Sequence, residues 1–128
     1  MRILLDSNIL LWFLDEPTRL KKTVFADIED RNNEILFSAA SIWEFAIKIG
    51  AKPGSLPIDA EEIFATALLT GFRELPVTGA VARHVAKLPL DHRDPFDRIL
   101  VAQAMSEPAL LYTSDRQLVP YSELVRLV

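Results

Sequence analysis

The sequence predicts an α/β protein, a three-layer α/β/α sandwich around a central, mostly parallel sheet of five strands. Short apolar runs alternate with longer helical patterns, which is typical of parallel strands joined by crossover helices. The first run, Ile3 to Leu5, is apolar throughout, as expected of a strand covered on both faces. With 128 residues, 50% of them hydrophobic, the chain has the size of one domain, and we expect a single one over residues 1–128.

Five segments have the composition and flanking residues of strands. They are residues 1–5, 35–37, 72–75, 109–112 and 125–128. Right-handed crossovers favour an order with the first strand in the middle, the second and third on one side and the last two on the other. Ligands of open α/β sheets bind outside the carboxyl ends of the strands. Asp6 ends the first strand and Asp115 follows the fourth, so this topology predicts both acids in one crevice.

Helices are predicted between the strands from apolar spacing, caps and breakers. They span residues 9–14, 19–31, 42–50, 60–70, 80–87 and 95–106, with a short one before the last strand. Ser7 or Asn8 can cap the first, and Ser41 with Glu44 has the form of a capping box for the third. Asp59 is expected to cap the fourth and Gly71 to end it. The helix over residues 42–50 is apolar nearly all round, which predicts that it is largely buried.

Composition limits the class of protein. The formal net charge of −4 argues against a general nucleic-acid binder, but not against an enzyme that meets phosphates through bound cations. There is no cysteine, hence no disulfide and no thiolate metal site, which fits a cytoplasmic protein. The apolar run from Ile9 to Leu14 is too short to span a membrane, so we expect no membrane association.

Three acids at predicted strand ends or helix starts have both a structural and a functional interpretation. Asp6 can cap the helix that follows it. Glu44 can complete the capping box, and it stands four residues before Lys48 in the favoured orientation for an ion pair. Asp115 can form a local turn with its own backbone. Their shared position at one edge of the sheet favours a common function, and both interpretations stay open.

Two further acids lie at the start of the helix over residues 95–106. Asp94 precedes Pro95, which is the favoured arrangement of a cap followed by proline at the first helical position. Asp97 is a second acid in the first turn of an otherwise apolar helix, more than capping requires. We therefore favour Asp97 for chemistry and Asp94 for structure, while Asp94 stays open as an additional acid.

Four carboxylates gathered without a cysteine or a matching histidine favour hard cations. Oxygen ligands of this kind select Mg²⁺ or Mn²⁺ over zinc. The chemistry that suits such a site is phosphodiester hydrolysis, with one or two ions activating water and stabilising the attacking and leaving oxygens. The candidate catalytic and metal-binding residues are Asp6, Glu44, Asp97 and Asp115.

The same residues carry a resemblance to a known family. The chain resembles PIN-domain proteins, specifically the VapC-type toxins of bacterial and archaeal type II toxin–antitoxin pairs. The likeness extends over essentially the whole chain, and the matching segments are residues 4–8, 41–44, 92–104 and 112–115. The third segment, with the other acids in order, is the most specific part. The family often begins Asp-Thr, and here Asp6-Ser7 keeps the hydroxyl.

The resemblance implies a function and partners. It implies an endoribonuclease toxin that uses Mg²⁺ or Mn²⁺, forms homodimers and is silenced by a cognate antitoxin whose tail enters the active-site groove. It implies that the family's acids fall on Asp6, Glu44, Asp97 and Asp115, and that Asn8, Thr113 and Ser114 orient carboxylates or water.

Basic residues near these acids give a third set of predictions. These residues are His92, Arg93, Arg98 and Arg116. They can contact RNA phosphates or the antitoxin, or equally they can balance the charge of the acids. A non-catalytic PIN-fold module that binds RNA or protein is the alternative function. An enzyme with an aspartyl nucleophile is less favoured, because no lysine lies near Asp115 or the last strand.

Overall fold

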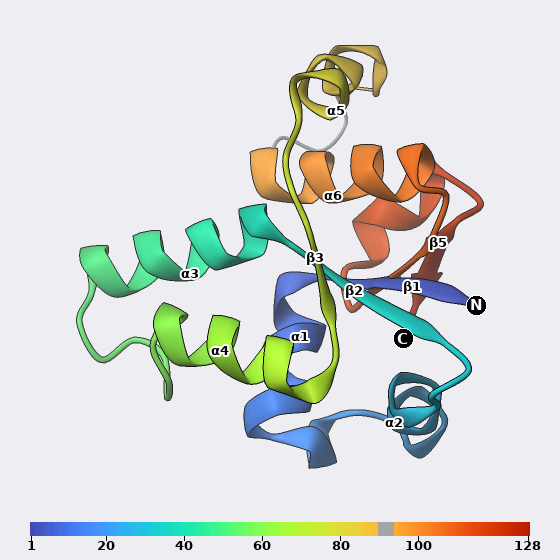
Figure 1. The fold of residues 1–128 in the computed structure, drawn as a ribbon. Helices are drawn as coiled ribbons and strands as arrows, with labels where there is room; N and C mark the ends of the chain where they lie inside the picture. Colours follow the sequence, from blue (N-terminus) through green and yellow to red (C-terminus); the bar gives the residue numbers. More distant parts are fainter. Residues whose placement is uncertain (90–93) are drawn as a thin grey trace.

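The computed structural model describes residues 1–89 and 94–128, which form a five-stranded parallel sheet with helices on both faces (Figure 1). The strand order is β3-β2-β1-β4-β5, so the predicted arrangement with the first strand in the middle is confirmed. The strands are β1 (Arg2–Leu5), β2 (Glu34–Ser38), β3 (Arg73–Leu75), β4 (Leu110–Thr113) and β5 (Val125–Leu127).

Six α-helices and three short 3₁₀ segments are found among the described residues. The helices are α1 (Ser7–Asp15), α2 (Lys22–Glu29), α3 (Ala39–Ala51), α4 (Ala60–Thr70), α5 (Gly79–His84) and α6 (Pro95–Ser106). The 3₁₀ segments are η1 (Pro17–Arg19), η2 (Val85–Lys87) and η3 (Arg116–Tyr121). The predicted helix over residues 19–31 is therefore corrected: η1 and α2 take its place, with an extended Leu20 at the end of η1.

Alternate residues of the central strands face two separate apolar cores. Ile3 and Leu5 of β1 pack with residues of α1, α2, α3 and α4 on one face. Leu4, between them, packs with residues of α6 and η3 on the other face. Figure 1 shows α5 and α6 on one side of the sheet and α1, α2 and α4 on the other. This period-two alternation in a strand covered on both faces produces the predicted three-layer sandwich.

Several predicted helix ends are confirmed by their hydrogen bonds. Asp59 caps α4 by accepting from the backbone N–H of Glu62 at 2.8 Å. Gly71 ends α4 in the left-handed region, at φ 98°. Asp94 caps α6 by accepting from the N–H of Phe96 at 2.9 Å, with proline at the first helical position.

Two predicted caps are wrong. The carboxylate of Asp6 itself caps α1, rather than Ser7 or Asn8. Helix α3 begins three residues earlier than predicted, because the Ser38 hydroxyl accepts from the N–H of Ala40 at 3.0 Å and so starts the helix at the end of β2. Glu44 therefore lies in the second turn and does not form a capping box.

The predicted burial of α3 is also wrong for most of its surface. Phe45 is buried, but Trp43 is 64% exposed and Ile47 is 45% exposed. The reason is visible in Figure 1: α3 leaves the end of β2 and runs outward past the strands, so that only its start lies close to the sheet. An apolar composition all round the helix therefore does not imply burial here.

Helix α1 accounts for the apolar run near the start of the chain. Ile9 and Leu10 are fully buried, and the residues that follow in α1 pack half-buried against the same core. Across the described residues, every helix is too short or too polar to cross a bilayer.

Candidate functional site

Asp6 is a carboxylate buried at the carboxyl end of the central strand, with 5% of its surface exposed. One oxygen, Oδ1, accepts from the N–H of Ile9 at 2.9 Å, and Oδ2 accepts from the N–H of Ser114 at 3.3 Å. The hydroxyl of Thr113 also hydrogen-bonds to this side chain. Burial nevertheless raises the pKa of Asp6, because these donors do not fully replace the water lost by the charged form. The backbone thus holds one carboxylate rigidly in an environment unfavourable to its charge.

Glu44 reaches the same region from α3. The hydroxyl of Ser7 donates to Glu44 Oε1 at 2.8 Å, and it lies 2.9 Å from the Ser41 hydroxyl. Since a hydroxyl has a single proton, Ser7 gives it to the carboxylate and can accept from Ser41. The charge of Glu44 further raises the pKa of Asp6, so the two carboxylates interact electrostatically. The predicted pair with Lys48 is confirmed at 3.2 Å.

Asp115 and Thr113 lie where β4 ends, beside β1. Thr113 is fully buried, and its Oγ1 accepts from the N–H of Asp115 at 3.0 Å. Asp115 Oδ1 accepts from the N–H of Gln117 at 2.9 Å and caps η3, so the predicted local turn is confirmed. The structure therefore links Asp6 to Asp115 through Thr113, a residue that hydrogen-bonds to both.

Asp97 lies in the first turn of α6, the third residue after its cap Asp94. Helix α6 begins beside α3: the rings of Phe96 and Trp43 meet edge to face, with their centroids 5.3 Å apart. Asp94 caps α6 through the N–H of Phe96, which is the structural role that we favoured for this acid. Asp97 is half-buried at the same end of the fold as Glu44.

The donor set has the chemistry of a hard-cation site. All four acids offer carboxylate oxygens, which suit Mg²⁺ and Mn²⁺, and a divalent cation would offset the repulsion between Asp6 and Glu44. Over residues 1–89 and 94–128, no three acidic or imidazole side chains stand close enough together to hold one ion. The chemistry of the donors therefore fits such an ion, but the positions of the described side chains do not enclose one.

The basic residues differ in their outcomes. The prediction that Arg98 contacts RNA or the antitoxin is wrong, because the residue is only 8% exposed. Its guanidinium donates to the backbone carbonyls of Val85 at 3.0 Å, Leu88 at 3.4 Å and Pro89. Its guanidinium instead fixes the segment after α5. Arg116 is exposed at the start of η3, as is Asn8 in α1. His92 and Arg93 lie outside the described residues.

Ser7 and Ser41 are site residues whose role the sequence did not reveal. Both were interpreted as caps, because serine before a helical pattern usually is one. Their hydroxyls belong to elements 34 residues apart and meet only in the folded chain. The adjacency of Ser7 to Asp6 at the end of a buried strand is the one local signal that could have indicated it.

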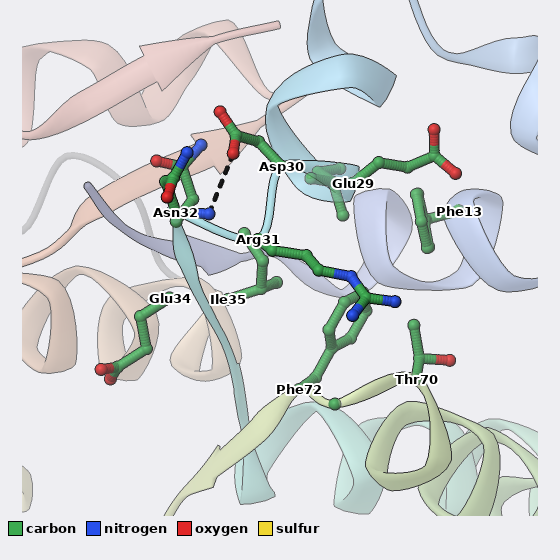
Figure 2. Close-up of a pocket in the computed structure, with 12 residues that line it drawn as sticks. Phe13, Glu29, Asp30, Arg31, Asn32, Glu34, Ile35, Thr70 and Phe72 are labelled. Atoms are coloured by element: carbon green, nitrogen blue, oxygen red, sulfur yellow. Dashed lines mark hydrogen bonds between the residues drawn. The ribbon is translucent and has the colours of Figure 1, made fainter.

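Two pockets flank the sheet at opposite edges. The larger, of about 900 Å³, lies at the amino ends of β2 and β3 (Figure 2). There the side chain of Arg31 extends beside Phe72, and Asp30 accepts from the N–H of Asn32 at 2.9 Å. None of the four candidate acids lines it. The second, of about 460 Å³, is an apolar groove between the starts of α3 and α6, next to Glu44 and Asp97 in the chain.

Comparison with known proteins agrees with this fold. Residues 3–124 match the PIN domain family. The chain is 31% identical over 117 residues to ribonuclease VapC22 of Mycobacterium tuberculosis, covering 91% of this chain and 88% of that protein.

Two solved structures resemble the fold at low sequence identity. One is VapBC2 from Rickettsia felis bound to a DNA fragment from its promoter, with TM-score 0.68, 13% identity, and coverage of 98% of this chain and 96% of the other. The second is M. tuberculosis VapC20, described as a sarcin-ricin loop cleaving toxin, with TM-score 0.62, 15% identity, and coverage of 94% and 97%.

The chain belongs to the PIN-domain family. Within that family it is a VapC-type protein, as its similarity to ribonuclease VapC22 over most of both chains indicates. The family expected from the sequence motifs is thereby confirmed.

Proposed function

We propose that this protein is an endoribonuclease that hydrolyses RNA phosphodiester bonds with Mg²⁺ or Mn²⁺ and acts as the toxin of a toxin–antitoxin pair. Membership of the PIN-domain family and the similarity to ribonuclease VapC22 support the activity. The solved VapBC2 structure, whose fold this chain shares, supports a cognate antitoxin as partner. We extend the proposal to a cytoplasmic homodimer, as the family resemblance implies.

One observation carries the proposal. Asp6 is a carboxylate kept buried beside a second carboxylate, although burial and the charge of Glu44 both oppose its ionisation. A structural cap needs no such arrangement, since Asp59 caps α4 from an exposed position. An unfavourable charge retained at the carboxyl edge of an α/β sheet is characteristic of a functional site.

The side chains have distinct roles in the proposed reaction. Asp6 is fixed by the N–H groups of Ile9 and Ser114, and Glu44 is oriented by Ser7, so both present oxygens without a reorganisation of the backbone. A bound Mg²⁺ or Mn²⁺ would supply activation of water and stabilisation of charge on the phosphodiester oxygens.

The remaining residues complete the proposed site. Asp97 and Asp115 would provide the other carboxylate ligands, and Thr113 and Ser114 would orient Asp6 and water. Asn8, exposed in the first turn of α1, is proposed for a similar orienting role. Arg116 is exposed next to Asp115 and is the basic residue that we propose for contact with an RNA phosphate.

The proposal is tested by RNA cleavage. We expect the wild-type protein to cleave RNA with Mg²⁺, and we expect this cleavage to stop when EDTA is added. Asp97→Asn or Glu44→Gln should reduce the cleavage rate by about 100-fold, because each removes a carboxylate ligand. Asp59→Asn is the matched control, since it alters a capping acid far from the site. RNA binding without cleavage under any divalent ion would instead establish the non-catalytic binding module.

A further inference from the structure

An apolar groove lies between the starts of α3 and α6. Its volume is about 460 Å³, and its walls include Ala40, Trp43, Val77, Phe96 and Ile99. Trp43 is 64% exposed and Val77 41% exposed, so much apolar surface faces solvent. Exposed apolar surface arranged as a concave site, rather than scattered, is characteristic of a binding surface.

The two aromatic rings are arranged to receive a flat group. Trp43 and Phe96 meet edge to face at an interplanar angle of 73°, so a flat group can stack on only one of the two rings, and Trp43, 64% exposed, offers its surface for this. Unpaired RNA bases bind proteins by stacking on such rings. An indole exposed on the wall of a groove is therefore suited to hold one base.

The groove also contains a hydrogen-bond acceptor. Glu74, half-buried in β3, is the one acid among the groove's described lining residues. In the part of the chain that the structure describes, its carboxylate has no hydrogen bond or ion pair. An apolar partner would bury this carboxylate unpaired, at a cost in free energy. The Watson–Crick edge of guanine carries two neighbouring N–H donors, which a carboxylate can accept together.

The groove and the candidate acids share the same two helix starts. Trp43 directly precedes Glu44 in α3, and Phe96 directly precedes Asp97 in α6. Figure 1 shows α3 and α6 beginning close together, near the end of β2. A strand of RNA with a phosphate at the acids therefore has an adjacent nucleotide within reach of the groove.

We propose that this groove is a base-recognition site for single-stranded RNA, in which Trp43 stacks on one unpaired guanine, Phe96 contacts the edge of that base and Glu74 accepts its N–H groups. The inference rests on the proposed ribonuclease function and adds the determinant of sequence preference. Binding of a second copy of the chain through Trp43 is the competing explanation, and the test separates the two.

The experiment measures RNA affinity by fluorescence anisotropy without divalent ions. Two labelled RNAs are compared, a short uridine-only strand and the same strand with one guanosine. We expect the guanosine strand to bind wild-type protein at least about tenfold more tightly, consistent with one stacked and hydrogen-bonded base.

Trp43→Leu, which keeps apolar bulk but removes the ring, should weaken binding of the guanosine strand about tenfold. Glu74→Gln should remove most of the guanine preference.

Leu69→Ala alters an exposed residue of α4 outside the groove and should leave both affinities unchanged. Unchanged RNA affinity of Trp43→Leu, or a full guanine preference in Glu74→Gln, would overturn the inference. So would a change of oligomeric mass by light scattering in Trp43→Leu with RNA affinity intact, which would identify an interface between copies. If Asp97→Asn loses cleavage while Trp43→Leu has no effect on RNA affinity, the ribonuclease proposal holds and the base-recognition proposal fails. If the protein binds the guanosine strand selectively but cleaves no RNA, the base-recognition proposal holds and the ribonuclease proposal fails.

Discussion

Asp6 combines two roles that are usually separate. Its Oδ1 caps α1 through the N–H of Ile9, and its Oδ2 accepts from the N–H of Ser114 at the end of β4. Burial and Glu44 raise its pKa, so the folded protein holds a proton on Asp6 more tightly than the unfolded chain does. The stability from that proton is present below the unfolded pKa and is lost as the pH rises through the folded pKa. At neutral pH, the ionised Asp6 carboxylate therefore makes the fold less stable than a protonated one would.

Asp6→Asn is expected to stabilise the protein at neutral pH in the absence of divalent ions. Asparagine caps helices as well as aspartate, so the substitution keeps the cap and removes the buried charge, and it gives up only the 3.3 Å bond from the Ser114 N–H. We expect the free energy of unfolding to rise by about 1–2 kcal/mol, measured by urea unfolding in EDTA. Asp59→Asn, at an exposed cap of the same type, should change it little. A destabilised Asp6→Asn protein would contradict this account, because it would show that the ionised carboxylate stabilises the fold.

Residue roles were predictable where chemistry is local. The caps Asp59 and Asp94 and the pair between Glu44 and Lys48 depend on spacing within one element, and all three were predicted correctly. Arg98 was not, because its partners are backbone carbonyls of the preceding segment, and no sequence spacing indicates that a guanidinium turns inward.

At the scale of elements, α3 and α4 end in different ways. Helix α4 ends at Gly71, whose φ of 98° is accompanied by a bond from the N–H of Phe72 to the carbonyl of Ala67 at 3.0 Å, a Schellman ending. Gly50, in contrast, lies inside α3 near its end. Gly71 is thus needed for the left-handed conformation that ends α4, whereas Gly50 has the ordinary helical conformation of α3, which other residues can adopt.

Alanine substitution at these glycines should have opposite effects. Neither added Cβ would meet an atom within 4 Å, so only the backbone decides. Gly71→Ala should lower the free energy of unfolding by about 1–2 kcal/mol, the cost of a left-handed alanine. Gly50→Ala should raise it by about 0.5–1 kcal/mol, because alanine favours the helix. Chemical denaturation of both variants measures this, and equal signs would contradict the helix ends described here.

The contact between α2 and β4 should give a pH dependence at alkaline pH. The Tyr112 hydroxyl donates to Asp27 Oδ2 at 2.7 Å, and burial, followed by this carboxylate, raises the pKa of Tyr112 to about 12. Because the unfolded tyrosine loses its proton near pH 10, the stability from Tyr112 is complete below that pH and is lost as the pH rises toward 12.

Tyr112→Phe tests this contact. Between pH 9 and pH 11 we expect the wild-type protein to lose up to about 1 kcal/mol more stability than the variant, measured by urea unfolding. Comparing slopes against pH removes the constant cost of the lost hydrogen bond. Parallel slopes for the two proteins would contradict the assignment.

Element boundaries were predicted less well than element types, for an identifiable reason. The end of β2 and the start of α3 are decided by the Ser38 cap, which lies in a run of four small residues with two serines that could each cap a helix, Ser38 and Ser41. The exposure of α3 could not be predicted either, since it depends on how far the helix projects beyond the sheet (Figure 1).

At the scale of the whole molecule, the order of the strands was predictable because crossover handedness leaves few arrangements of parallel strands. That order alone places Asp6 beside the end of β4, and the structure confirms it through the bond from the Ser114 N–H. The finer assembly of the site was not predictable, because the hydroxyl contact of Ser7 with Ser41 and Glu44 depends on side-chain packing between distant elements.

The central claim is that the acids at the carboxyl edge of the sheet form a divalent-metal site, and equilibrium binding of Mn²⁺ tests it most directly. Titration followed by the electron paramagnetic resonance signal of free Mn²⁺ should show binding to the wild-type protein and to Asp59→Asn with equal affinity. In Asp6→Asn we expect the affinity to fall at least about tenfold, because a ligand carboxylate is lost. Equal Mn²⁺ affinity of wild-type protein and Asp6→Asn, or no binding by either, would contradict the claim.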